Sequence, residues 1–244
     1  MAEKKIQFRT KFVNTRNVGA FASLMDALTM ARGGRHDGDE RLGCVWSRAG
    51  RGKTRTVQTW AANNNAVYLE TVITWSELDF LRALGRELGV RYPAGRRGKA
   101  FADCLDAMTD RPRVLFIDEI ERFGQRMLEV VRDLAKMSGG VIVLIGEEEL
   151  PHLMRLNRRV WSRTYREMEF VPASPADVVL YVNQTTGLEL TPEAMAVMHK
   201  ASDGDMRIIR RDTINLVHVV NSMDRLGKVS AETASIACAT GLQG

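Results

Sequence analysis

The sequence is poor in the residues that build disulfide frameworks and metal sites. It has three cysteines, an odd number with no C-x-x-C spacing, and its four histidines follow no metal-ligand pattern. We therefore expect neither disulfide bonds nor a structural zinc site.

Long apolar runs, repeats and low-complexity tracts are missing as well. No segment approaches the roughly 20 consecutive apolar residues that a membrane-spanning helix needs. The amino terminus has no apolar stretch after its basic residues, so we expect no secretory signal or membrane anchor, and a location in the cytoplasm. Hydrophobic residues make up 45% and charged residues 27%, which excludes the disordered, collagenous and membrane classes.

The net charge and the length of the chain limit its possible partners and domain number only loosely. The chain has 35 Lys and Arg against 30 Asp and Glu, a net charge of +5, and a sequence pI near 9.3. This mild basic excess is compatible with a nucleic-acid partner but does not establish one. A length of 244 residues allows one large domain or two small ones.

Short apolar runs alternate with helix-like segments over the first two thirds of the chain. The strand-like runs are residues 42–46, 66–72, 114–117 and 141–145. The helix-like segments are residues 20–31, 54–63, 76–88, 99–109 and 126–137, with a loop at 32–41. Continuous apolar strands separated by helices are typical of a parallel sheet covered on both faces, so we predict an α/β architecture.

The pattern changes after Pro172. Ser174, Thr191 and Ser230 each precede a helix-like run, as N-capping residues do. Four glycines stand where such helices would end, namely Gly187, Gly204, Gly227 and Gly241. We therefore predict an α/β subdomain over residues 1–172 and a small helical subdomain over residues 173–244.

A phosphate-binding loop follows the first predicted strand. Residues 47–54 read S-R-A-G-R-G-K-T, which matches the G-x-x-x-x-G-K-[ST] pattern except that Ser47 replaces the first glycine. Glycine permits backbone N–H groups to turn toward phosphates, the lysine reaches the β- and γ-phosphates, and the threonine hydroxyl binds Mg²⁺. The predicted nucleotide-binding residues here are Ser47, Gly50, Arg51, Gly52, Lys53, Thr54 and Arg55.

Two carboxylates end the third predicted strand. Asp118 and Glu119 follow the apolar run 114–117, so they belong at the carboxyl edge of the sheet beside the phosphate loop. This is a Walker B motif: Asp118 would bind Mg²⁺ together with Thr54, and Glu119 would be the general base that activates water. The two motifs together predict binding and hydrolysis of ATP with Mg²⁺, with Lys53 also counted as catalytic.

The helical part carries a third motif. Residues 204–207, G-D-M-R, resemble the sensor 2 segment of AAA+ ATPases related to origin-recognition and clamp-loader proteins. Residues 159–163, R-V-W-S-R, followed by a strand-like segment at 167–171, resemble that group's R-V-x-S-R segment. The resemblance implies that Arg207 is the sensor 2 arginine, that the helical part is a lid, and that Arg163 is an arginine finger acting on a neighbouring subunit. The alternative for Arg163 is a surface ion pair with Glu167 or Glu169.

Within AAA+ proteins, the chain is similar to the bacteriophage Mu B family of transposition ATPases. Residues 12–18, F-V-N-T-R-N-V, are similar to that family's F-V-E-T-R-N stretch, which packs beside adenine, so the resemblance places Asn17 at the nucleotide. Residues 145–150, I-G-E-E-E-L, are similar to its I-G-x-x-E-L segment. The first sensor position would fall at or near Glu147, where a carboxylate beside a γ-phosphate is electrostatically unfavourable, so we leave Glu147 out of the site.

The family also implies a DNA-binding surface. Its members place the helix after the second strand and the adjoining loops on DNA, and here six basic residues occupy that stretch: Arg82, Arg86, Arg91, Arg96, Arg97 and Lys99. About forty residues precede the phosphate loop, so we expect DNA binding to come from the ATPase body. No base-reading helix is evident, which predicts nonspecific contacts with phosphates. The alternative is a solvated charged loop.

The resulting functional hypothesis is an ATP-dependent protein that forms helical filaments or rings on nonspecific double-stranded DNA. It would present this DNA to a DNA transposase and activate it in the cytoplasm of a bacterial host, and ATP hydrolysis would dissolve the oligomer. Two alternatives remain open: a AAA+ replicative-helicase loader, which would prefer single strands, and a binding module that holds ATP only as a structural ligand.

Overall fold

The computed structural model describes residues 5–30, 42–223 and 227–240. The chain divides into two compact units. One is Phe21–Ala49 with Lys53–Phe170, and the other is Met1–Ala20 with Gly50–Gly52 and Val171–Gly244. Each unit is described by itself.

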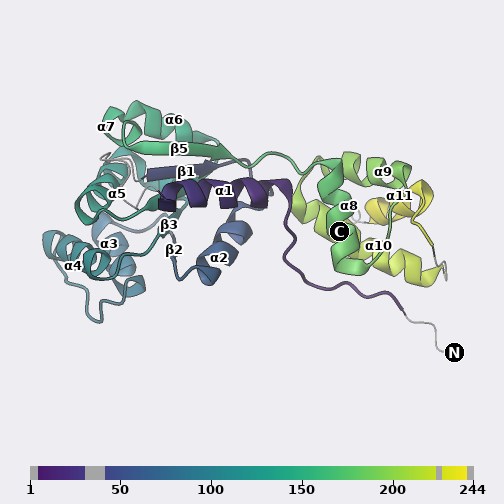
Figure 1. Ribbon diagram of the computed structural model, residues 1–244, viewed down its shortest axis with the longest axis horizontal. Helices are drawn as coiled ribbons and strands as arrows, with labels where there is room; N and C mark the ends of the chain where they lie inside the picture. Colours follow the sequence, from purple (N-terminus) through teal and green to yellow (C-terminus); the bar gives the residue numbers. More distant parts are fainter. Residues whose placement is uncertain (1–4, 31–41, 224–226, 241–244) are drawn as a thin grey trace. The chain divides into compact units, whose positions relative to one another are not determined.

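A parallel sheet of five strands organises the first unit (Figure 1). The strands are β1 Leu42–Trp46, β2 Val67–Glu70, β3 Leu115–Asp118, β4 Ile142–Gly146 and β5 Thr164–Glu169. Their order across the sheet is β2-β3-β4-β1-β5, and every pairing is parallel. Since all strands run the same way, the residues that follow β1, β3 and β4 gather at one edge of the sheet.

Helices cover both faces of this sheet. They are α1 Arg16–Met30, α2 Lys53–Asn63, α3 Glu77–Glu87, α4 Arg97–Asp110, α5 Gly124–Ser138, α6 Glu149–Leu156 and α7 Arg158–Trp161, with a 3-10 helix, η2, at Ile120–Phe123. Alternating strand residues point to opposite faces, so Phe116 packs with Phe21 of α1 and Val57 of α2, whereas Ile117 packs with the cluster that includes Leu84 of α3 and Leu128 of α5. The structure therefore confirms the predicted α/β architecture.

The second unit is helical. Its helices α8 Pro175–Thr186, α9 Pro192–Ser202, α10 Met206–Ser222 and α11 Ala231–Thr240 enclose their own apolar core. Ser174, Thr191 and Ser230 each accept a backbone N–H from the first turn of the helix they precede, which confirms the three predicted N-caps. Gly187 ends α8 in the left-handed conformation, as predicted.

The amino-terminal segment lies in this helical unit. The backbone N–H of Ile6 donates to Asn221 Oδ1 at 2.9 Å, and the Asn221 amide donates back to the Ile6 carbonyl at 2.8 Å. Val13 is buried in the core of the helical unit. Residues separated by most of the chain thus form one compact body.

The start of α1 differs from the prediction of residue 20. The helix begins at Arg16, and its Arg16 N–H donates to Asp177 Oδ1 at 2.8 Å. An unpaired N–H at a helix start needs an acceptor, and here the acceptor comes from α8, far along the sequence. Thr15 stands directly before the helix, and its carbonyl accepts the Gly19 N–H at 3.1 Å.

Several other boundaries also differ. Helix α4 begins at Arg97 rather than at residue 99, β2 is shorter than the predicted 66–72, and β5 covers Thr164–Glu169 rather than 167–171. Helix α10 ends at Ser222, so Gly227 does not terminate it. Helices α6 and α7 were not predicted as elements, and α10 was predicted only through its stop at Gly227. The predicted loop 32–41, residue 31 of the first helix and the stop at Gly241 lie outside the described residues.

Two further observations concern the described residues. None of their helices is both long and apolar enough to cross a membrane. All three cysteines are buried free thiols, and burial raises the pKa of the Cys104 thiol to about 12.

Candidate functional site

The predicted phosphate-binding loop lies between β1 and α2, the strand–turn–helix context that the motif requires. Gly50 and Gly52 have φ angles of 83° and 91°. These values lie in the left-handed region that glycine adopts without strain. The G-x-G-K-T part of the motif therefore has the backbone conformation for which its glycines are needed.

Lys53 is held inside this loop. Its side chain is 9% exposed, and Nζ donates to the Ser47 carbonyl at 2.7 Å, to Ser47 Oγ at 2.9 Å and to the Arg48 carbonyl at 3.4 Å. Ser47, the residue in place of the motif's first glycine, thus adds a hydroxyl acceptor that glycine lacks. A nucleotide phosphate that bound Lys53 would compete with these acceptors.

Thr54 and Asp118 come together as predicted for a magnesium site. Thr54 Oγ1, in the first turn of α2, lies 3.3 Å from Asp118 Oδ2 at the end of β3. A hydroxyl and a carboxylate are hard oxygen ligands, and Mg²⁺ is typically bound by one or two such groups together with substrate phosphates. The donor set therefore fits Mg²⁺ carried by a nucleotide. Among the described residues, no group of three or more His, Cys, Asp or Glu side chains could hold a metal ion.

Glu119 follows Asp118 in a left-handed conformation, with φ of 60°. Its backbone N–H donates to the Ile145 carbonyl at 2.8 Å, and its carbonyl accepts a hydrogen bond from Thr71 Oγ1 at 2.8 Å. The carboxylate forms an ion pair with Arg122. Burial raises the pKa of Glu119, while Arg122 partly opposes this rise. The backbone of Glu119 is thus fixed by hydrogen bonds, and its carboxylate is held by Arg122.

Two polar side chains near the site were missed by sequence reasoning. Tyr68 in β2 donates its phenolic hydrogen to Asp118 Oδ2 at 2.7 Å. Glu121 accepts a hydrogen bond from the Glu147 N–H at 2.9 Å, and burial raises the pKa of the Glu121 carboxyl. Neither residue belongs to a recognisable motif, and each contact joins elements distant in sequence. The exposed Glu147 itself follows β4, next to the residues that follow β3.

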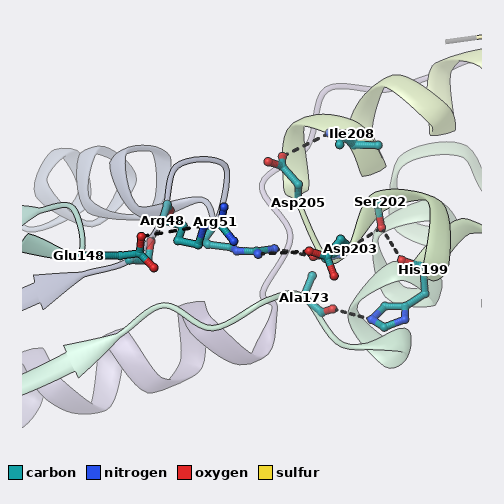
Figure 2. A network of polar contacts seen from close by, with 11 residues as sticks. Arg48, Arg51, Glu148, Ala173, His199, Ser202, Asp203, Asp205 and Ile208 are labelled. Carbon is teal, nitrogen blue, oxygen red and sulfur yellow. Dashed lines mark hydrogen bonds and ion pairs between the residues drawn. The ribbon is translucent and has the colours of Figure 1, made fainter. Parts of the chain in front are cut away.

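The tip of the phosphate loop contacts the start of α10 within the helical unit. The Met206 N–H donates to the Gly50 carbonyl at 2.9 Å, and Arg51 Nη1 donates to the Asp203 carbonyl at 2.6 Å, as Figure 2 shows for Arg51. Arg51 is 9% exposed. A Cβ atom on Gly50 would collide with the Asp205 carboxylate, which caps α10. Arg51, which was predicted to bind the nucleotide, is therefore bonded to the protein itself, through the Asp203 carbonyl.

Asn17 is also held by protein contacts. It is buried, its side-chain amide donates to the Val171 carbonyl at 2.8 Å, and its Oδ1 accepts the Val171 N–H at 3.3 Å. This pair of bonds ties α1 to the segment that precedes α8. Arg55, the last predicted residue of the phosphate loop, is exposed in the first turn of α2.

The two predicted trans-acting and sensor arginines lie in different units. Arg207 is exposed in the first turn of α10, and its N–H donates to the capping Asp205 Oδ1 at 2.7 Å. Arg163 is half-buried between α7 and β5, and its carbonyl accepts the Leu42 N–H at 3.3 Å. Glu167, one of the two ion-pair partners considered for Arg163, accepts hydrogen bonds from Arg155 at 2.7 and 2.8 Å.

The six predicted DNA-binding residues fall into two groups. Arg97 pairs with Glu77 at 3.3 Å, Lys99 pairs with Asp103 at 2.9 Å, and Arg82 is half-buried on α3. Arg86, Arg91 and Arg96 are exposed. Arg91 lies over the ring of the exposed Tyr92, 5.3 Å from its centroid. Arg97 and Lys99 are exposed as well, but each is paired with a carboxylate, whereas no such ion pair is found for Arg86, Arg91 and Arg96 among the described residues.

Comparisons with known proteins show what this chain is similar to. Residues 35–154 match the family model described as an AAA domain. The fold resembles Cdc6p from Pyrobaculum aerophilum, with a TM-score of 0.63 and 13% identity over 91% of this chain and 68% of that one. It also resembles the Aeropyrum pernix Orc1 protein, solved in complex with DNA, with a TM-score of 0.55 and 17% identity over 93% of this chain and 65% of that one. No curated protein sequence matches significantly. These likenesses confirm the predicted fold but do not distinguish the Mu B family within it.

Proposed function

We propose that this chain, whose fold is that of AAA+ P-loop NTPases, binds ATP with Mg²⁺ and hydrolyses it. The observation that carries the proposal is the distance of 3.3 Å between Thr54 Oγ1 and Asp118 Oδ2. In the sequence, these two residues are adjacent to Lys53 and Glu119. A bound Mg²⁺ would neutralise phosphate charge and polarise the γ-phosphoryl group. Lys53 would bind the β- and γ-phosphates, and Glu119 would orient water and take its proton.

We further propose that hydrolysis depends on assembly. In the proposed homo-oligomer, Arg163 of one subunit would stabilise the charge that develops on the γ-phosphate bound by the next, and Arg207 would bind the nucleotide held by its own subunit. Arginine is suited to both roles because its planar guanidinium pairs with phosphate oxygens in a fixed geometry. The resemblance of residues 159–163 and 204–207 to AAA+ segments supports this assignment.

The proposed ligand of the assembled protein is double-stranded DNA, bound without sequence specificity. The exposed Arg86, Arg91 and Arg96 support this proposal, and the structurally similar Orc1 protein was solved in complex with DNA. Repetition of a few phosphate contacts along a filament or ring would add to a strong, salt-dependent affinity.

The most specific part of the proposal is a role in transposition: the oligomer would deliver target DNA to a DNA transposase and would activate this transposase. Its support is the similarity of residues 12–18 and 145–150 to the Mu B family. The test is a strand-transfer assay with a purified DNA transposase of the Mu type, run with and without this protein and ATP. We expect more strand transfer into DNA coated by the protein, and equal transfer with and without it would contradict this role.

Strand preference separates this role from the helicase-loader alternative. Competition between labelled duplex and unlabelled single strands of equal length should leave the duplex bound in the presence of ATP. Displacement by a low concentration of single strands would instead favour a helicase loader. DNA binding without detectable ATP hydrolysis, even by the assembled protein, would favour the module that uses ATP as a structural ligand.

The basic surface gives a quantitative prediction. The double variant Arg91→Ala/Arg96→Ala should weaken duplex binding at all sequences, because it removes charges that interact with phosphates rather than bases. The slope of log K against log salt concentration should become shallower by about 0.9 for each phosphate that the variant no longer neutralises. Fluorescence anisotropy at several salt concentrations measures this slope.

The matched control is Lys136→Ala/Arg111→Ala, which removes two exposed positive charges at the last turn of α5 and just after α4. This control should keep the wild-type slope. Equal slopes for all three proteins would assign the DNA contacts to another surface.

A further inference from the structure

Tyr68 reaches the magnesium-binding carboxylate from the neighbouring strand. In the parallel pairing of β2 with β3, Tyr68 lies opposite Phe116 and Glu70 opposite Asp118. Residues two apart share a face of the sheet, so Tyr68 and Asp118 are diagonal neighbours on the same face. The ring packs against the cluster that contains Phe116 and Val57, and its hydroxyl extends to the end of β3.

The bond from Tyr68 is the shorter of the two side-chain bonds to Asp118. Tyr68 Oη lies 2.7 Å from Asp118 Oδ2, whereas Thr54 Oγ1 lies 3.3 Å from the same oxygen. The usual distance for an O–H···O bond is about 2.7–2.8 Å. Asp118 Oδ1 accepts the Glu119 N–H at 3.0 Å. Tyr68 therefore makes the contact that most closely restricts how the Asp118 carboxylate rotates.

Tyr68 is the donor in this bond, because an ionised carboxylate only accepts hydrogen bonds. A carboxylate has about four acceptor positions, and the three donors from Tyr68, Thr54 and Glu119 occupy most of them. Together these donors restrict the orientation of the carboxylate.

We propose that Tyr68 is a positioning residue for Mg²⁺: its hydroxyl holds Asp118 in the orientation that serves the metal ion beside Thr54. The inference rests on the proposed function, because Mg²⁺ would arrive with ATP. Partners that orient metal ligands typically contribute 10- to 100-fold in metal affinity or activity. Tyr68 touches neither nucleotide nor reacting atoms in this account and acts only through Asp118.

The test uses Tyr68→Phe, which keeps the packed ring and removes the hydroxyl. Binding of a fluorescent ATP analogue is titrated with Mg²⁺ and, separately, measured with EDTA. We expect the Mg²⁺ concentration for half-maximal enhancement of binding to rise about 10-fold, with unchanged affinity in EDTA. Because both affinities come from the same variant, their ratio is insensitive to a reduced folded fraction. Tyr165→Phe, a partly buried tyrosine of β5 in the same cluster, is the matched control and should behave as wild type.

A second comparison shows whether Tyr68 acts through Asp118. In an Asp118→Asn background, Tyr68→Phe should cause no further change in Mg²⁺ dependence. The inference is overturned if Tyr68→Phe keeps the wild-type Mg²⁺ dependence, or if it changes that dependence equally in both backgrounds. In either case nucleotide binding by the wild type would leave the proposed function intact. Failure of the wild-type protein to bind the nucleotide at all would overturn both.

Discussion

Replacing Glu119 with glutamine should abolish most ATP hydrolysis while ATP binding persists. Glutamine has nearly the same shape but cannot take a proton from water, and a positioned general base typically contributes about 10²–10⁴-fold in rate. The backbone bonds of residue 119 to Ile145 and Thr71 do not involve the carboxylate, so the substitution leaves them in place. The loss should therefore appear in the rate of phosphate release and not in nucleotide affinity.

The measurement is phosphate release by the assembled protein, beside equilibrium binding of a fluorescent ATP analogue. Glu149→Gln is the control, because Glu149 is an exposed glutamate at the start of α6. It should hydrolyse ATP at the wild-type rate. If Glu119→Gln retained a third or more of wild-type activity, another group would have to be the base.

The second large effect is expected from Arg163→Ala. An arginine finger is typically worth about 10³–10⁵-fold in rate, and it matters only where subunits meet. The variant should therefore lose the stimulation that accompanies assembly, whereas the dilute protein keeps its slow basal rate. Arg158→Ala, which removes an exposed arginine of α7, is the matched control and should retain the stimulation.

Mixing two inactive variants tests whether Arg163 acts on the neighbouring subunit. Arg163→Ala subunits keep Glu119, and Glu119→Gln subunits keep Arg163, so some interfaces of a mixed oligomer would contain both groups. We expect hydrolysis to reappear on mixing, toward a fraction of the wild-type rate. A mixture no more active than its components would mean that Arg163 serves its own subunit or only the fold.

The strands around the site could be predicted because their sequences are continuous apolar runs. Residues 42–46 form β1 with the predicted bounds, and the other two central strands, β3 and β4, each begin and end one residue later than predicted. A strand buried on both faces leaves little choice of residue. Edge strand β5 differs more: none of its residues is buried, three of its six residues are charged, and it begins and ends closer to the amino terminus than predicted.

Contacts between distant segments could not be predicted in the same way. The start of α1 depends on an acceptor, Asp177, that only the folded helical unit supplies. Helix α6 was not predicted, and Pro151 lies in its first turn, a position that is compatible with proline.

The site residues also divide into those that a motif predicts and those that depend on contacts between segments. Lys53, Thr54, Asp118 and Glu119 follow from motifs, because phosphate and Mg²⁺ chemistry restricts residue type at fixed spacing. Tyr68 and Arg122 do not, since their roles arise from strand pairing and from a single turn of η2.

The central claim is that ATP bound at Lys53 makes the protein competent to bind duplex DNA. The most direct measurement is the fluorescence anisotropy of a labelled random-sequence duplex titrated with wild-type protein and with Lys53→Ala, each in ATP and in ADP with Mg²⁺. Lys53→Ala removes the buried cation that would bind the phosphates. The account predicts tight, salt-sensitive binding only by wild type in ATP. Equal duplex binding by both proteins, or by wild type in ATP and ADP, would contradict it.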